Sequence, residues 1–116
     1  GREVNITFNV DENCDFDMEN DAVGTRDMTL SDELDEWVLE NAFKGNGEVR
    51  SGGNGLNVYM RVPVYDPDTG RPRSIKSETG KLRRFASGLL KDKGYTVSEK
   101  AASGQYIQLL IQNSRE

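Results

Sequence analysis

The sequence has 116 residues, of which 34% are hydrophobic and 30% are charged, and its formal net charge is −5. This length suits one domain that buries a core without disulfides or metals. No run of apolar residues approaches the roughly 18 that a membrane-spanning helix needs. The first residues also lack a basic segment leading into an apolar run, so we expect neither a membrane anchor nor a signal peptide.

Histidine is absent from the sequence, and Cys14 is the single cysteine. Histidine is the commonest general base and metal ligand, and the usual partner of a serine or cysteine nucleophile. Carboxylates surround Cys14 along the chain, which disfavours a reactive thiolate. One cysteine forms no intrachain disulfide, which favours a reducing, cytoplasmic location. We therefore expect a non-enzymatic protein without a metal or cofactor.

The charge is divided unevenly along the chain. Residues 1–48 hold 14 acids and 3 bases, a formal charge of −11, whereas residues 49–116 hold 6 acids and 12 bases, a formal charge of +6. One explanation is that the acidic half folds against the basic half. The other is that the charges attract a charged partner.

The first predicted element is a strand over residues 3–10, where apolar and polar residues alternate. Residues 11–28 are acidic and have no clear period, so we predict a long, flexible loop. Its alternating acids and amides are typical of the start of a calcium loop. However, Phe16 and Ala22 occupy the positions where an EF-hand requires glycine and glutamate, so we expect no specific calcium site.

A helix is predicted next, with Thr29 and Ser31 as candidate N-caps and acids in the first turns, where the helix dipole favours negative charge. A second helix is predicted over residues 77–93, with Gly94 as its C-cap. Each carries an apolar stripe at helical spacing. The residues expected to be buried together are Trp37, Leu82, Phe85, Leu89, Ile107 and Leu109.

Two β-hairpins complete the chain. Residues 48–65 alternate around a turn at residues 51–55, and Pro63 places the end of this hairpin at an edge or bulge because proline donates no ladder hydrogen bond. Residues 66–70 have the composition of a turn. The second hairpin runs from residue 95 to residue 112, with its turn near residues 101–104.

The resulting order, β-α-β-β-α-β-β, predicts a single α+β domain over residues 1–116, with a mainly antiparallel sheet and two helices on one face. Its two α-β-β units align at spacings of 48 and 49 residues, as in Leu34 with Leu82 and Val58 with Ile107. A duplication explains this, and so does the general similarity of amphipathic α-β-β units.

Our leading functional hypothesis is a small protein-binding module, such as an adaptor, regulator or inhibitor, whose acidic segment docks on a basic surface of another protein. If that surface binds nucleic acid, the protein is a nucleic-acid mimic of the kind that phage and other mobile elements use, an argument by analogy. The residues expected to contact the partner are Asp15, Asp17, Glu19, Asp32, Glu33, Asp35 and Glu36.

The alternative hypothesis is a single-strand nucleic-acid-binding protein that uses the second helix and an uncovered sheet face. If Val58 and Ile107 point to the helices, the alternate residues of the strands place amides and tyrosines on the other face. That face could equally be plain solvent surface or a homodimer interface. The residues expected to contact nucleic acid are Tyr59, Arg61, Tyr106, Arg83, Arg84 and Lys91.

Overall fold

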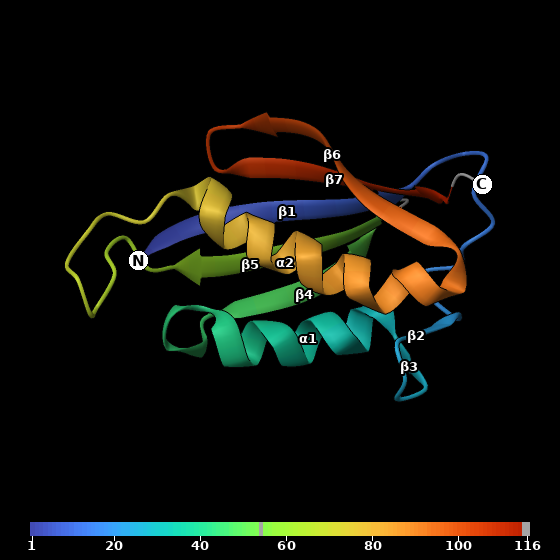
Figure 1. Ribbon diagram of the computed structural model, residues 1–116, viewed down its shortest axis with the longest axis horizontal. Coiled ribbons are helices and arrows are strands. Elements are labelled where there is room, and N and C mark those ends of the chain that lie inside the picture. The colour runs from blue at the N-terminus through green and yellow to red at the C-terminus, as the bar shows by residue number, and fades with distance from the viewer. Residues whose placement is uncertain (54, 115–116) are drawn as a thin grey trace.

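The computed structural model of the protein describes residues 1–53 and 55–114. Within these residues, the predicted order β-α-β-β-α-β-β is present, and a small second sheet is added to it (Figure 1). The strands are β1 (Arg2–Val10), β2 (Ala22–Val23), β3 (Met28–Thr29), β4 (Gly47–Gly52), β5 (Gly55–Val62), β6 (Tyr95–Ser103) and β7 (Tyr106–Asn113). The helices are α1 (Leu30–Asn41) and α2 (Ile75–Leu90), each followed by a short 3-10 helix, η1 (Phe43–Gly45) and η2 (Lys91–Lys93).

The main sheet has the strand order β4-β5-β1-β7-β6, so the first strand of the chain lies at its centre. β1 is antiparallel to β5 and parallel to β7, and the two outer pairs are antiparallel. The predicted α+β class and mainly antiparallel sheet are thus confirmed. The parallel pair was not predicted, because alternation within a strand does not determine its neighbours. Asn54, in the turn predicted between β4 and β5, lies outside the described residues.

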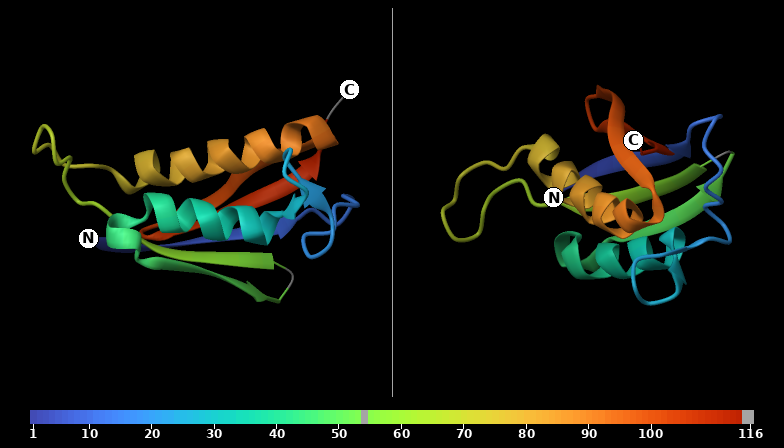
Figure 2. Two further views of the ribbon diagram at one scale, coloured as in Figure 1. Left: turned by 90° about the horizontal axis from the view of Figure 1, so that it is seen from below. Right: turned by 45° about the vertical axis from the view of Figure 1, so that its right-hand side comes forward.

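Both helices cover one face of this sheet, as predicted (Figure 2). α1 packs over β4 and β5, and α2 packs against β6. The alternating residues of β1 confirm the direction of burial, since Val4, Ile6 and Phe8 are buried beneath the helices. Neither described helix combines the length and the apolar character that spanning a bilayer requires.

The helix starts depend on side-chain caps. Of the two candidates Thr29 and Ser31, Thr29 caps α1, because its hydroxyl accepts a hydrogen bond from the backbone N–H of Asp32 at 3.3 Å. α2 begins earlier than predicted, since the hydroxyl of Ser74 accepts from the backbone N–H of Ser77 at 3.0 Å. Its end agrees with prediction, because Gly94 follows η2 in a left-handed conformation (φ 93°).

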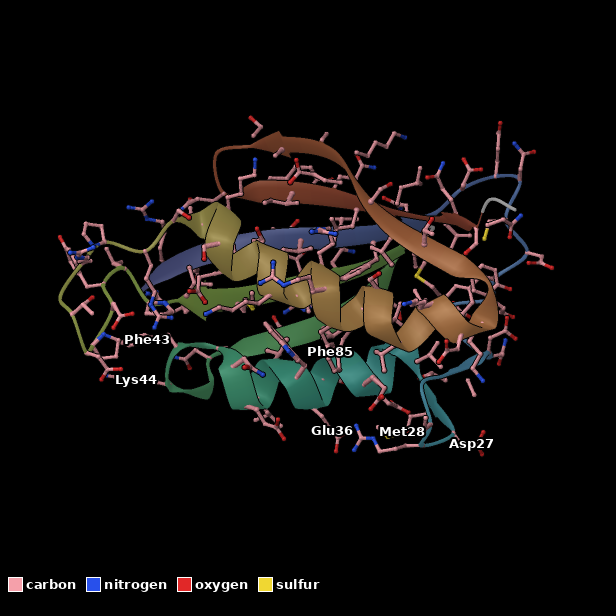
Figure 3. The ribbon with its side chains drawn as sticks, viewed as in Figure 1. Asp27, Met28, Glu36, Phe43, Lys44 and Phe85 are labelled. Atoms are coloured by element: carbon pink, nitrogen blue, oxygen red, sulfur yellow. The ribbon has the colours of Figure 1, made fainter. Side chains whose placement is uncertain are left out.

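The predicted core needs one correction. Leu82, Ile107 and Leu109 are buried, but Trp37, Phe85 and Leu89 are only partly buried. The rings of Trp37 and Phe85 stack with centroids 6.0 Å apart, and Figure 3 shows Phe85 in the seam between the helices. A side chain in such a seam keeps one side in solvent. Helical periodicity does not separate these positions from those that face the sheet.

The acidic segment 11–28 is more structured than predicted. Phe16, Met18 and Val23 are buried, and β2 pairs with β3 in a short hairpin. Phe16 packs on Tyr95 with ring centroids 5.0 Å apart. These apolar residues are separated by acids at irregular intervals, so neither the strand nor the helix period reveals them.

The sheet register relates the two α-β-β units. Val58 and Ile107 both lie opposite Ile6, while Met60 lies opposite Val4 and Leu109 opposite Phe8. The pairs Val58/Ile107 and Met60/Leu109 are those that align at a spacing of 49 residues. This register fits two units related by a twofold axis at Ile6. It is compatible with a duplication, one of the two explanations that the sequence left open.

Candidate functional site

The face of the main sheet opposite the helices is called here the open face. In one row across the three middle strands, Tyr59 of β5 and Tyr106 of β7 both lie opposite Asn5 of β1. Each tyrosine is 41% exposed. Neighbouring strands lie about 4.8 Å apart, so these two residues stand roughly 10 Å apart on one surface. The open face thus brings together two of the residues expected to contact nucleic acid.

Most of the other side chains that β1, β5 and β7 place on this surface are polar and uncharged. The hydroxyl of Thr7 donates to the amide oxygen of Asn57 at 2.9 Å, and the amide of Gln108 donates to that of Asn9 at 3.0 Å. The residues on β1, β5 and β7 that face this side agree with the predicted set, Asn5, Thr7, Asn9, Asn57, Tyr59, Arg61, Tyr106, Gln108, Leu110 and Gln112.

A groove of about 460 Å³ borders Tyr59 at the β4 side of the open face. Arg50 lies over the Tyr59 ring, 5.7 Å from its centroid, and pairs with Glu48 at 2.7 Å. On the same side, Arg61 lies 3.9 Å from Glu3. Sequence reasoning missed Glu48 and Arg50. Their spacing of two on a strand puts them on the same face as each other, and the register of β4 with β5, which sets Glu48 opposite Tyr59, makes this the open face.

The basic residues of α2 do not join this site. Arg83, Arg84 and Lys91 lie on or just after α2, which packs on the opposite face of the sheet. Arg83 and Arg84 instead line a second groove, of about 400 Å³, between α2 and the strands β6 and β7, and Glu99 shares it. The expected nucleic-acid surface is therefore divided between two faces. Sequence reasoning did not show this, because the period of a helix or a strand does not tell which face of the sheet the helix covers.

Arg26 organises the acids at the start of α1. Its guanidinium pairs with Glu33 and with Glu36, and these hydrogen bonds raise the pKa of Arg26, with Glu36 contributing most. Glu33 is only 3% exposed, whereas Glu36 lies on the side of α1 away from α2 (Figure 3). The structure thus leaves Glu33 almost no surface for a partner. Sequence reasoning missed Arg26, the one base within the acidic stretch from 11 to 40.

Two other acids of α1, Asp32 and Asp35, are exposed. Partial burial raises the pKa of Asp35, and the negative charge of Asp32 adds to this effect. Like charges are therefore crowded on this part of α1.

The acids of the preceding segment differ among themselves. Asp15 accepts a hydrogen bond from the Tyr95 hydroxyl at 3.0 Å. Asp17 accepts from the side chain of Asn20 and from the backbone N–H of Glu19, and these contacts lower the pKa of Asp17. Glu19 itself is exposed. Asp15 and Asp17 therefore already hold the fold of this segment together.

The charge division persists between the two helices, although the pairs Arg50–Glu48 and Arg61–Glu3 join the two halves at the sheet. Among the described residues, no ion pair joins an acid of α1 to a base of α2. The acids of α1 pair with Arg26 of their own half, and α2 uses Lys81 for its own Glu78. The explanation that the two halves neutralise each other is thus not supported for the helices.

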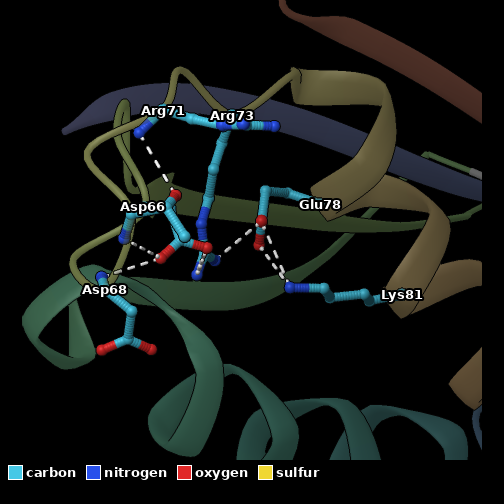
Figure 4. Close-up of polar contacts among 7 residues, drawn as sticks. Asp66, Asp68, Arg71, Arg73, Glu78 and Lys81 are labelled. Atoms are coloured by element: carbon cyan, nitrogen blue, oxygen red, sulfur yellow. Dashed lines mark hydrogen bonds and ion pairs between the residues drawn. The ribbon is translucent and has the colours of Figure 1, made fainter.

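A polar network holds the projecting loop between β5 and α2 (Figure 4). Arg73 pairs with the buried carboxylate of Glu78 at 2.9 Å and with Asp66 at 3.4 Å, and Lys81 pairs with Glu78 at 3.2 Å. The backbone N–H of Asp68 donates to Asp66, which lowers the pKa of Asp66 and confirms the turn predicted there. These groups satisfy one another, so we assign the network a structural role.

In the described part of the chain, no group of three or more His, Cys, Asp and Glu side chains is placed so that it could hold a metal ion. Cys14 is a partly exposed free thiol.

Comparison with known protein families gives one match. The model of a domain of unknown function, DUF6175, covers residues 2–111, almost the whole chain. The protein belongs to this family. Comparison with curated proteins gave no significant match, and comparison with solved structures gave none either. The match spans β1 to β7, so both α-β-β units belong to the family domain.

Proposed function

We propose that this protein is a non-enzymatic binding module whose ligand-binding surface is the open face. The observation that supports this is the row of Tyr59, Asn5 and Tyr106 on a sheet face that no described element covers. Tyrosine supplies a large contact area at a low entropic cost and is enriched where proteins bind ligands.

The charge content of the open face also distinguishes it from ordinary solvent surface. Although 30% of the residues in the sequence are charged, nine positions that β1, β5 and β7 place on this face carry no charge, and the charged residues Glu3 and Arg61 lie at one end of these strands. Soluble proteins normally place charged residues on exposed surfaces, which keeps them from associating. The nine positions are Asn5, Thr7, Asn9, Asn57, Tyr59, Tyr106, Gln108, Leu110 and Gln112.

A second candidate function is docking on a basic protein surface through the acids of α1, such as Asp32 and Asp35. The exposure of Asp32 and Asp35 supports this candidate. Partial burial is the main cause of the raised pKa of Asp35, and the repulsion from Asp32, which adds to it, is the part that a basic partner would relieve. The neutralisation of Glu33 and Glu36 by Arg26 weakens it. A role as inhibitor or nucleic-acid mimic would follow from this candidate alone.

Single-strand nucleic-acid binding receives less support, because Arg83, Arg84 and Lys91 do not share a face with Tyr59 and Tyr106. The cytoplasm remains the proposed location, on the basis of the lone cysteine.

The test is capture of ligands from an extract of the source cells on the immobilised protein. The variant Tyr59→Thr/Tyr106→Thr removes both rings while keeping residues that favour strands. Tyr65→Thr is the matched control, since Tyr65 is 61% exposed and lies beyond β5. We expect captured protein, nucleic acid or saccharide to be lost with the double variant alone. Equal capture by all three proteins would contradict the proposal.

A further inference from the structure

The chemistry of the open face also indicates what it binds. We propose that its ligand is an uncharged polysaccharide chain that crosses the strands from Tyr59 to Tyr106. This inference rests on the proposed function and deepens it by naming the class of ligand.

The first argument is charge. The charged side chains that border the groove beside Tyr59 pair with each other, Arg50 with Glu48 and Arg61 with Glu3. The face therefore has no net charge of either sign, although strongly acidic and basic surfaces exist elsewhere on the molecule. A phosphate backbone requires unpaired cations, and a basic protein surface requires unpaired acids. An uncharged polar ligand fits this surface better than either.

The second argument is hydrogen bonding. Each side-chain amide carries two N–H donors and an oxygen that accepts two hydrogen bonds. Asn9, Asn57 and Gln108 each use part of this capacity within the face, so donors and acceptors remain for a ligand. Sugar hydroxyls both donate and accept, and a surface of amides matches them without burying a charge.

The third argument is the spacing of the aromatic rings. Two strand spacings, about 10 Å, separate Tyr59 from Tyr106, which is roughly the length of a disaccharide unit. The C–H faces of sugar rings pack on aromatic rings. An extended chain would meet Tyr106 at one end of this step and, at the other end, Tyr59 together with Arg50, which lies 5.7 Å from the centroid of the Tyr59 ring. The groove lined by Glu48, Arg50 and Arg61 continues the path beyond Tyr59.

A second copy of this chain fits the open face less well. The buried centre of a homodimer interface is more apolar than the rest of the surface, but Leu110 is the sole aliphatic residue of the nine uncharged positions. Pairing two such faces would bury many amides against each other.

The experiment is affinity electrophoresis in native gels that contain one soluble neutral polysaccharide each: hydroxyethyl cellulose, laminarin, galactomannan or glycogen. We expect at least one of them to retard the wild-type protein. The variant Tyr59→Thr/Tyr106→Thr should raise the apparent dissociation constant roughly tenfold or more, whereas Tyr65→Thr should leave it unchanged. The variant Tyr59→Phe/Tyr106→Phe keeps both rings and should retain most of the retardation. Circular dichroism melts establish that each variant folds.

The inference is overturned if none of the four polysaccharides retards the wild-type protein, or if the double threonine variant is retarded equally. Two further arms separate this failure from failure of the proposed function. Tyrosine-dependent binding of an oligothymidylate, or a tyrosine-dependent dimer in sedimentation, would keep the open face as a binding site but replace its ligand. If no interaction depends on Tyr59 and Tyr106, including capture of ligands from the extract, both proposals are wrong.

Discussion

At the scale of single residues, the sequence pattern does not show which charged side chains are buried, paired or exposed. The four acids at the start of α1 look alike in sequence, yet Glu33 is buried and paired, Glu36 is paired at the surface, and Asp32 and Asp35 are exposed. Glu33 lies one position before Leu34, at the edge of the apolar stripe. The helical period alone cannot show that Arg26, seven residues earlier, turns back to meet it.

Replacing Arg26 by alanine should therefore destabilise the protein. The buried carboxylate of Glu33 would lose its partner, and an uncompensated buried charge costs more than the pair contributes. The double variant Arg26→Ala/Glu33→Leu removes the buried charge and should recover stability, whereas Glu36→Gln should have little effect because Glu36 is about half exposed. Urea melts measure all four proteins. Equal midpoints for Arg26→Ala and the wild type would refute the assigned role.

For Asp35 we predict the opposite effect, that removing its charge stabilises the protein. Its pKa is raised in the folded protein, so its charge costs stability once the pH exceeds the ordinary value of 3.8. Asp35→Asn should raise the melting temperature at pH 7, and the gain should vanish as the pH falls below that value. Asp66→Asn is the control, because the pKa of Asp66 is lowered and its charge stabilises the fold above the same pH. A melting temperature for Asp35→Asn below that of the wild type at pH 7 would contradict this explanation.

At the scale of elements, period and turn chemistry predicted most of the fold. Apolar and polar residues alternate in β1, β5 and β7. Thr29 marks the start of α1, and Gly94 marks the end of the helical segment formed by α2 and η2. Two features were not predicted from the sequence. The buried residues Phe16 and Met18 follow neither the strand period nor the helix period, and the position of Phe85 between the helices depends on where α1 lies.

The central position of β1 makes Phe8 the better test of the core. Phe8 has no exposed surface and lies between β5 and β7, so Phe8→Ala should lower the free energy of unfolding by about 3–5 kcal/mol. Phe85→Ala should cost clearly less, since the seam is partly open to solvent. Denaturant melts that reverse this order would show that the layers are wrongly described.

Two glycines provide a matched pair. A Cβ at Gly55 would overlap the backbone oxygen of Phe8, whereas a Cβ at Gly88, within α2, would meet nothing within 4 Å. Gly55→Ala should therefore destabilise the sheet. Gly88→Ala should stabilise the protein by about 0.5–1 kcal/mol, because alanine favours the helix. Thermal melts compare the two, and a neutral Gly55→Ala would argue against the close approach of β5 to β1.

At the scale of the whole molecule, the sequence predicted which residues share the open face, but it did not predict the strand order that brings them together. Alternation placed Tyr59 and Tyr106 on the face away from Val58 and Ile107, as the structure confirms. Their position in one row required the strand order β5-β1-β7, which unites segments about 50 and 100 residues apart. The same global arrangement places the bases of α2 on the opposite face, and no local pattern contains that information.

Three surfaces thus compete as the binding surface: the open face, the acids of α1 and the bases of α2. The most direct measurement places a photo-reactive benzoylphenylalanine at one representative exposed or half-exposed position of each, Asn57, Asp32 and Arg84, and irradiates each protein in an extract of the source cells. Our account predicts adducts from position 57 and few from positions 32 and 84. Adducts mainly from position 32 or 84, with none from position 57, would contradict the assignment of the open face as the binding surface.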